Sequence, residues 1–287
     1  MKFLIAGLGN FYRAWKLVEH VVPVADELGF HGLLIPDHFM WDWKDMPERN
    51  STLDAWTALS YLAGKTKKLK LGTLVTPIPF RPPGILAKIV ATLDVISSGR
   101  AILGVGAGWS QTEFEGYSDW TDGKTRVDKT EEGVQLILKL WKEASVDFQG
   151  RFYKAKGGVL DPKPVQKPHP PLLFGGVSPR MLRLAGKYGD MCFIPPWTQT
   201  PFNKAKSIVD MEAKSAGRQL KLEYGAGSPM IRGAFDMKTL EKDIQTAVDN
   251  GCRFYVTPFP QDDYVAKMRE FARDVMPSYA DRKGSRA

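Results

Sequence analysis

The chain has 287 residues, of which 43% are hydrophobic and 25% are charged, the composition of an ordinary globular protein. No apolar run approaches the roughly 20 residues that a membrane-spanning helix requires, so the composition excludes such a helix and predicts no membrane partner. The net charge of +8 comes from basic residues interleaved with acidic ones, which predicts a solvated surface and no nucleic-acid partner.

The number and spacing of cysteines and histidines indicate the cellular compartment and whether a metal site is expected. Two cysteines, Cys192 and Cys252, are too few for a disulfide framework, so a reducing cytoplasm is expected. The four histidines lack the spacing of metal ligands, and we expect no metal site. Residues 1–13 contain a short apolar stretch without a small-residue cleavage site, which predicts a first strand and not a signal peptide.

Strands and helices are predicted to alternate along the whole chain. Short apolar runs predict strands at residues 2–6, 31–35, 69–75, 101–105, 172–174, 191–194, 222–232 and 253–257. One-sided apolar patterns predict helices at residues 11–28, 52–64, 85–96, 125–143, 179–188, 202–216, 237–250 and 262–275. This order predicts a closed (β/α)8 TIM barrel, with an open doubly wound sheet as the alternative.

Three stretches lie outside this alternation, and none of them marks a composition break, so residues 1–287 are treated as one domain. An inserted hairpin and irregular arm are expected near residues 146–171, with the hairpin at 146–153 and Gly150 at its turn. Residues 111–121 are interpreted as a loop. Residues 279–287 are polar and are expected to be frayed.

Two unusual loops follow neighbouring strands in the first half of the chain. Residues 76–84 are rich in proline and predict neither strand nor helix. Gly104, Gly106 and Gly108 would let the backbone approach a planar or phosphorylated ligand, although tight packing at a barrel corner is an equal alternative. Ligands bind at the carboxyl ends of barrel strands, so we expect both loops to form the floor of one cofactor site, with Trp109 as a flat wall.

Asp37 and His38 follow the second predicted strand. A histidine there can exchange a proton near neutral pH and can hydrogen-bond a ring carbonyl. The alternative is a buried histidine that is satisfied by a neighbouring carbonyl, with Asp37 capping a loop. The position at the end of a barrel strand favours a catalytic role for the pair.

Gly175, Gly176 and Ser178 lie between a predicted strand and a predicted helix. Small residues, a hydroxyl and free amides at a helix start form a seat for a phosphate, whereas a plain turn is the alternative. A rival phosphate motif, Gly7-Leu8-Gly9, resembles a dinucleotide fingerprint. Tyr12 replaces its third glycine, and the following acid, Asp37, comes about 28 residues after Gly9 instead of about 20.

Several motifs resemble the luciferase-like flavin-dependent monooxygenases: DHF at 37–39, the run at 71–100, LGVGAGW at 103–109 and QTEF at 111–114. The stretches at 150–176 and 182–190 resemble the branch of that family that uses the 5-deazaflavin coenzyme F-420. The resemblance covers about residues 30–195 and is weak in the last third of the chain. It implies a (β/α)8 barrel with an inserted arm and with FMN or a deazaflavin bound at the carboxyl ends of the strands.

The resemblance also implies roles for individual residues. Asp37 and His38 match the pair that faces the reactive edge of the ring, and a bulge with a non-prolyl cis peptide at Thr73–Leu74 is expected behind the ring. Thr73 and Leu74 of this bulge are expected to bind the cofactor. The other expected cofactor-binding residues lie in the two glycine-containing loops: Gly106, Ala107, Trp109, Gly175, Gly176 and Ser178. Sugar-phosphate dehydrogenases of the family carry a proton-donating Glu where this chain has Trp109, which argues against sugar chemistry.

These features predict an oxidoreductase that transfers a hydride between a deazaflavin and a small organic substrate, with His38 as acid or base. The positive net charge favours the deazaflavin, whose tail carries extra carboxylates. An FMN-dependent monooxygenase that uses reduced flavin and oxygen is the alternative, followed by a non-catalytic partner barrel and a Rossmann nicotinamide dehydrogenase. The substrate is expected to contact residues 41–49, residues 117–121 and Trp197. The resemblance allows a homodimer and a separate flavin or deazaflavin reductase as partners.

Overall fold

The strands of the computed structural model close into a parallel barrel. The structure describes residues 1–9, 11–41, 51–198, 200–219, 222–231 and 233–280. Within these residues the barrel strands are β1 (Lys2–Ala6), β2 (Gly32–Ile35), β3 (Lys70–Thr73), β5 (Ala101–Gly106), β8 (Leu172–Phe174), β9 (Met191–Phe193), β10 (Glu223–Gly227) and β11 (Phe254–Pro258).

The strand order establishes that the sheet is closed. Neighbours pair in the order β3-β2-β1-β11-β10-β9-β8-β5, and an additional β3–β5 pairing joins the two ends. This ring confirms the predicted (β/α)8 barrel and excludes the open doubly wound sheet. The nicotinamide-binding Rossmann alternative is therefore wrong, because it requires an open sheet.

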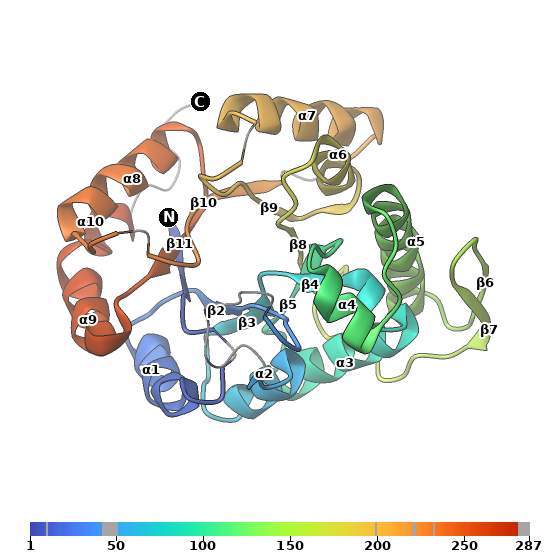
Figure 1. Ribbon diagram of the computed structural model, residues 1–287, viewed down its shortest axis with the longest axis horizontal. Helices are drawn as coiled ribbons and strands as arrows, with labels where there is room; N and C mark the ends of the chain where they lie inside the picture. Colours follow the sequence, from blue (N-terminus) through green and yellow to red (C-terminus); the bar gives the residue numbers. More distant parts are fainter. Residues whose placement is uncertain (10, 42–50, 199, 220–221, 232, 281–287) are drawn as a thin grey trace.

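Helices surround the ring of strands (Figure 1). They are α1 (Trp15–Glu27), α2 (Ala55–Ala63), α3 (Pro83–Ile96), α4 (Gln111–Tyr117), α5 (Gly123–Lys142), α6 (Pro179–Tyr188), α7 (Phe202–Ser215), α8 (Met237–Asp249), α9 (Tyr264–Asp274) and α10 (Pro277–Ala280). None of the helices in the described ranges is both long and apolar enough to cross a lipid bilayer.

Side-chain alternation along the strands divides the core into two layers. On β1, Leu4 belongs to the small cluster inside the barrel, whereas Phe3 and Ile5 belong to the larger layer between strands and helices. The inner cluster is completed by side chains from several other strands, among them Leu34, Ile102, Leu173, Phe193, Phe254 and Val256. The barrel interior is therefore packed, which leaves the ends of the strands as the place for a site.

The proline-rich stretch after β3 is more ordered than expected. Strand β3 ends at Thr73, and the non-prolyl cis peptide joins Leu74 to Val75, one residue later than predicted. A short strand, β4 (Thr76–Pro77), then pairs with β5, and a 3-10 turn, η1 (Ile78–Phe80), follows. The prediction of neither strand nor helix at residues 76–84 was therefore wrong in detail, although proline still confines both elements to a few residues.

Helix α4 was not predicted, because residues 111–121 were interpreted as a loop. Ser110 caps it by accepting a hydrogen bond from the backbone N of Glu113 at 3.3 Å. Ser110 and Glu113 have the spacing of a capping box, which is a sequence signal for a helix start. The prediction missed this signal because few apolar residues follow it.

The predicted insertion is an antiparallel hairpin, β6 (Val146–Gln149) and β7 (Lys154–Gly158), which lies outside the ring of strands (Figure 1). Its second strand begins after Tyr153, farther along the chain than predicted. Glu132 on α5 accepts hydrogen bonds from three successive backbone N–H groups of the turn, so the turn is fixed to that helix.

The C-terminal end differs from the expected frayed segment. Tyr279 lies on α10, is buried, and its carbonyl accepts a hydrogen bond from the N-terminal amine of Met1 at 2.9 Å. Residues 281–287, the rest of that prediction, lie outside the described residues.

His31 provides a pH test of the fold. Burial, followed by the positive charges of Lys2 and Lys70, lowers its pKa from 6.5 to about 4. Between these values the unfolded chain binds a proton that the folded chain does not bind, so the free energy of unfolding falls as the pH decreases from 6.5 to 4. Because His31 is partly exposed, we expect this contribution to be about 1–2 kcal/mol.

The measurement is chemical denaturation of the wild type and of His31→Gln at pH 7.5 and pH 4.5. The variant should gain stability relative to the wild type at the lower pH, because it carries no proton-binding group at this position. A stability difference that is the same at both pH values would contradict the perturbed His31.

Candidate active site

A cavity of about 970 Å³ opens at the carboxyl ends of the barrel strands. This volume lies at the upper end of the range for small-molecule sites. The lining comes from the segments that follow β2, β3, β5, β8 and β9 and from the starts of α4, α5 and α6. The site is thus assembled from segments that are distant in sequence.

Eight of the ten predicted site residues line this cavity: His38, Leu74, Gly106, Ala107, Trp109, Gly175, Gly176 and Ser178. The remaining two, Asp37 and Thr73, do not line it and are 1% and 0% exposed. The structure thus places Asp37 and Thr73 behind the surface of the cavity, whereas both were expected in the site. His38 lines the cavity, whereas the side chain of the adjacent Asp37 is enclosed behind it.

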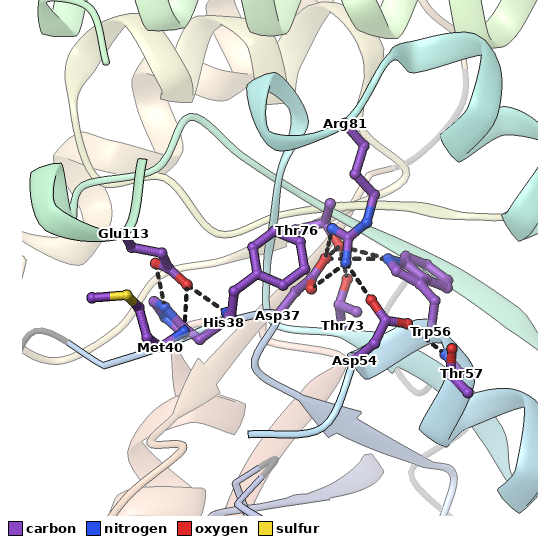
Figure 2. Close-up of polar contacts among 11 residues, drawn as sticks. Asp37, His38, Met40, Asp54, Trp56, Thr57, Thr73, Thr76, Arg81 and Glu113 are labelled. Carbon is purple, nitrogen blue, oxygen red and sulfur yellow. Dashed lines mark hydrogen bonds and ion pairs between the residues drawn. The ribbon is translucent and has the colours of Figure 1, made fainter. Parts of the chain in front are cut away.

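Asp37 is the centre of a buried polar network (Figure 2). Its Oδ2 accepts hydrogen bonds from Arg81 Nη1 at 2.7 Å, Thr76 Oγ1 at 2.8 Å and Trp56 Nε1 at 3.2 Å, and its Oδ1 accepts from Arg81 Nη2 at 3.0 Å. Burial raises the pKa of Asp37, and the Arg81 charge opposes that shift. Arg81 also pairs with Asp54 at 2.7 Å, so the network joins the segment after β2 to α2 and to the proline-rich stretch.

His38 is held from several sides beside this network. Its Nδ1 lies 2.8 Å from Oε2 of Glu113. The Trp41 ring is tilted over the imidazole at a centroid distance of 4.1 Å, and Trp109 approaches edge-on at 5.7 Å. The structure therefore fixes the ring plane of His38 at the wall of the cavity.

Glu113 is a site residue that the sequence analysis did not identify. Its position in the QTEF motif, which carried part of the family resemblance, was a signal that could have found it. The structure describes part of the expected substrate-contacting region. Trp41 packs on His38, the Tyr117 ring is tilted against the Phe39 ring at a centroid distance of 4.8 Å, and Trp197 lines the cavity. Residues 42–49 of that expectation lie outside the described residues.

The glycines around the cavity serve packing. A Cβ on Gly106 would lie 2.5 Å from Val75 Cγ2, and a Cβ on Gly176 would lie 2.4 Å from Cβ of Met181. Gly108 has φ of +78°, and its Cβ would meet the Phe114 ring at 2.4 Å. Glycine at these positions therefore lets neighbouring segments approach closely, which shapes the cavity wall.

One end of the cavity is electropositive. Lys124, Arg126 and Arg180 line it where the starts of α5 and α6 meet. Arg180 pairs with Asp128, whereas no ion pair of Arg126 is found among the described residues. The Arg126 guanidinium lies over the Trp120 ring at 3.9 Å, and its Nη1 donates a hydrogen bond to the carbonyl of Thr121. Its buried Nε has no hydrogen-bond partner in the described part of the chain.

The chemistry of this end fits an anionic group. Burial lowers the pKa of Arg126, and the negative charge of Asp122 opposes that shift. The side chain of Ser178 caps α6 by accepting from Met181 N at 3.3 Å. A helix start and the unpaired Nε–H of Arg126 together favour phosphate or carboxylate oxygens.

Comparison with known proteins gives one family and several similar structures. A family model described as luciferase-like monooxygenase matches residues 9–274. The monooxygenase RslO1 from Streptomyces bottropensis has a TM-score of 0.79 and 22% identity, with 97% of this chain and 100% of that chain covered. An F-420-dependent secondary alcohol dehydrogenase, in complex with an F-420–acetone adduct, has a TM-score of 0.79 and 21% identity over 96% and 98% of the two chains.

A third structure contains FMN. The oxygenating constituent of 3,6-diketocamphane monooxygenase from Pseudomonas putida, in complex with FMN, has a TM-score of 0.64 and 19% identity. The match covers 79% of this chain and 66% of that chain. At these identities the three structures share the barrel fold with this chain, and their ligands are properties of those proteins.

The Asp37 network gives a prediction about stability. In Asp37→Asn the Arg81 guanidinium loses its buried charged partner, so we expect the free energy of unfolding to fall by about 3 kcal/mol. Asp274→Asn is the matched control, because its pair with Arg273 is exposed and should contribute little to stability. Chemical denaturation checks both variants. Equal effects in the two variants would show that the Asp37 network does not stabilise the barrel.

Proposed function

The chain belongs to the luciferase-like monooxygenase family, whose model matches residues 9–274, and on that premise we propose that it is an oxidoreductase that uses the deazaflavin coenzyme F-420. It exchanges a hydride between this cofactor and a small organic substrate. The observation that carries the proposal is the single cavity that joins His38 to the cationic end near α5 and α6.

The ring of the cofactor fits the part of the cavity near His38. Leu74 and Val75 supply an apolar surface after β3, and Ala107 and Trp109 supply another after β5. A flat heterocycle gains from apolar contact on its faces and from few polar partners at its edge. When bound, a deazaflavin or flavin supplies the two-electron chemistry that protein side chains lack.

The tail of the cofactor fits the cationic end. Arg126 and Lys124 would hold anionic oxygens, and the segment that contains Gly175, Gly176 and Ser178 would hold a phosphate at the start of α6. Coenzyme F-420 carries carboxylates beyond its phosphate, so it can use more of these cations than FMN can. The net charge of +8 acts in the same direction through long-range attraction.

His38 would exchange a proton with the substrate beside the ring. An imidazole can accept or donate a proton near neutral pH, and the packing by Trp41 and Trp109 keeps this imidazole in one orientation. Asp37 takes no direct part in this proposal, because it is buried in the network behind the site.

An FMN-dependent monooxygenase is the second candidate. The phosphate seat is compatible with FMN, the matched family is described as monooxygenases, and the diketocamphane enzyme was solved with FMN. We propose a cytoplasmic location for either enzyme, with a homodimer and a separate reductase as the possible partners that the resemblance implies. A non-catalytic partner barrel is the remaining alternative.

The cofactor is tested by titrating the purified protein with coenzyme F-420 and with FMN and following absorbance and fluorescence. We expect saturable binding of coenzyme F-420 that is tighter than binding of FMN. Tight FMN binding with oxygen uptake would replace the proposal by the monooxygenase. Binding of neither cofactor would leave the non-catalytic barrel.

The cationic end is tested with Arg126→Ala. Loss of a charge-assisted contact should weaken coenzyme F-420 binding by roughly 10- to 100-fold, because such contacts contribute about 1.5–3 kcal/mol. Arg151→Ala is the control, because Arg151 is exposed on the hairpin and stacks on Phe152. Equal dissociation constants for the two variants would remove Arg126 from the cofactor site.

The role of His38 is tested with His38→Ala. Loss of a general acid or base should reduce kcat by about 10²- to 10⁴-fold, whereas the dissociation constant of the cofactor should change little. Steady-state kinetics and the cofactor titration measure the two effects separately. A variant that turns over like the wild type would show that His38 moves no proton in the reaction.

A further inference from the structure

A buried carboxylate lies directly against the proposed acid–base residue. Glu113 on α4 is 1% exposed, and its Oε2 is 2.8 Å from His38 Nδ1 (Figure 2). Its other oxygen, Oε1, accepts hydrogen bonds from the backbone N of Phe39 at 2.6 Å and of Met40 at 3.3 Å. The carboxylate therefore contacts three consecutive residues of the segment that follows β2.

The chemistry of these contacts fixes the direction of the hydrogen bond to His38. A backbone N–H can only donate, so Oε1 of Glu113 must accept from Phe39 and Met40. When Glu113 is ionised, its Oε2 can also only accept, and it favours a proton on the imidazole nitrogen that faces it. A neutral imidazole carries one N–H and one acceptor nitrogen, so a proton on Nδ1 makes Nε2 the acceptor.

We propose that Glu113 is a positioning residue that holds His38 in the tautomer protonated at Nδ1, so that Nε2 is the nitrogen that accepts a proton during turnover. This inference rests on the proposed function, because that function places the reaction at His38. Glu113 acts through His38 and needs no contact with substrate or cofactor.

The surroundings of Glu113 support a fixed position. The adjacent Phe114 is fully buried and packs against Phe80 at a ring centroid distance of 4.4 Å, which anchors α4. A glutamate three residues after a helix cap commonly returns to the backbone of the capping residue. The hydrogen bonds of the Glu113 carboxylate in the described structure go instead to the segment at His38, so its side chain is oriented toward the site.

The wild-type protein gives the most direct test. Long-range ¹H–¹⁵N correlation of the imidazole rings distinguishes the two neutral tautomers, and a chain with four histidines gives few signals. His38→Gln assigns the His38 signal. At a pH where the ring is neutral, we expect His38 to show the Nδ1–H tautomer. An Nε2–H tautomer in the wild type would overturn the inference without any need for a variant.

Glu113→Gln tests the cause. The Gln carbonyl can replace Oε1 as the acceptor from Phe39 and Met40, which turns the amide N–H₂ toward His38 Nδ1. An amide donor there requires Nδ1 to accept, so the variant should invert the His38 tautomer while it preserves the shape of the site. We expect kcat to fall roughly 10- to 100-fold, the range seen when the partner that orients a metal-binding histidine is altered, with little change in cofactor affinity.

The matched control is Glu115→Gln, which makes the same chemical change two residues away on α4. Glu115 is exposed and contacts Gln111 at 2.7 Å, so this variant should keep the tautomer and the kcat of the wild type. A Glu113→Gln protein that keeps the Nδ1–H tautomer would overturn the inference. If Glu113→Gln does not fold, Glu113→Asp provides the second test. This variant keeps a carboxylate, so His38 should keep the Nδ1–H tautomer. An Nε2–H tautomer in Glu113→Asp would also overturn the inference.

The two measurements, the tautomer of His38 and the turnover, separate this inference from the proposed function. An inverted tautomer with unchanged turnover would support the positioning by Glu113 and would contradict the acid–base role of His38. A protein that binds neither cofactor would contradict the proposed function, whereas the tautomer of His38 would still be measurable and would still decide the role of Glu113.

Discussion

The buried ion pair between Asp37 and Arg81 is the interaction on which the mouth of the barrel depends. Arg81 donates to both oxygens of Asp37 and also pairs with Asp54, so one guanidinium joins the segment after β2 to the start of α2. A carboxylate as buried as that of Asp37 is tolerated only when an opposite charge pairs with it and hydrogen-bond donors reach its oxygens. The segment that carries His38 is consequently fixed at its base by Asp37.

Two adjacent residues therefore have different roles, with Asp37 in the structural network and His38 at the proposed site of the reaction. Asp37 points away from the cavity into its network, and His38 lines the cavity and is fixed by Glu113 from α4 (Figure 2). The cavity then continues to the cationic end formed by Lys124, Arg126 and Arg180. A ligand that is flat and apolar at one end and anionic at the other suits both ends of this cavity.

The barrel could be predicted from the sequence because this fold is recognised by the order of its strands and helices. Each strand needs only a short apolar run and each helix a one-sided apolar pattern, as at residues 172–174 and 179–188, where predicted and observed bounds agree. The resemblance also located most of the loops that line the cavity. These features are local in sequence, so they can be recognised without three-dimensional contacts.

The errors concern features that depend on contacts between distant segments. Whether Asp37 or His38 faces the cavity depends on where Arg81 lies, and a sequence pattern does not contain that distance. Glu113 was overlooked because α4 is short and its partner is 75 residues away. Gly104, Gly106 and Gly108 allowed two equal interpretations, and the close contacts they make with Thr73, Val75 and Phe114 come from other segments of the chain.

The central claim is that a planar redox cofactor binds at the barrel mouth beside His38. The most direct test follows the ring signals of all four histidines by NMR while coenzyme F-420 is added. His20 on α1, His31 just before β2 and His169 in the inserted arm are not among the residues that line the cavity. The account predicts that the His38 signals shift and that those of the other three stay in place; saturable binding that leaves His38 unchanged would contradict it.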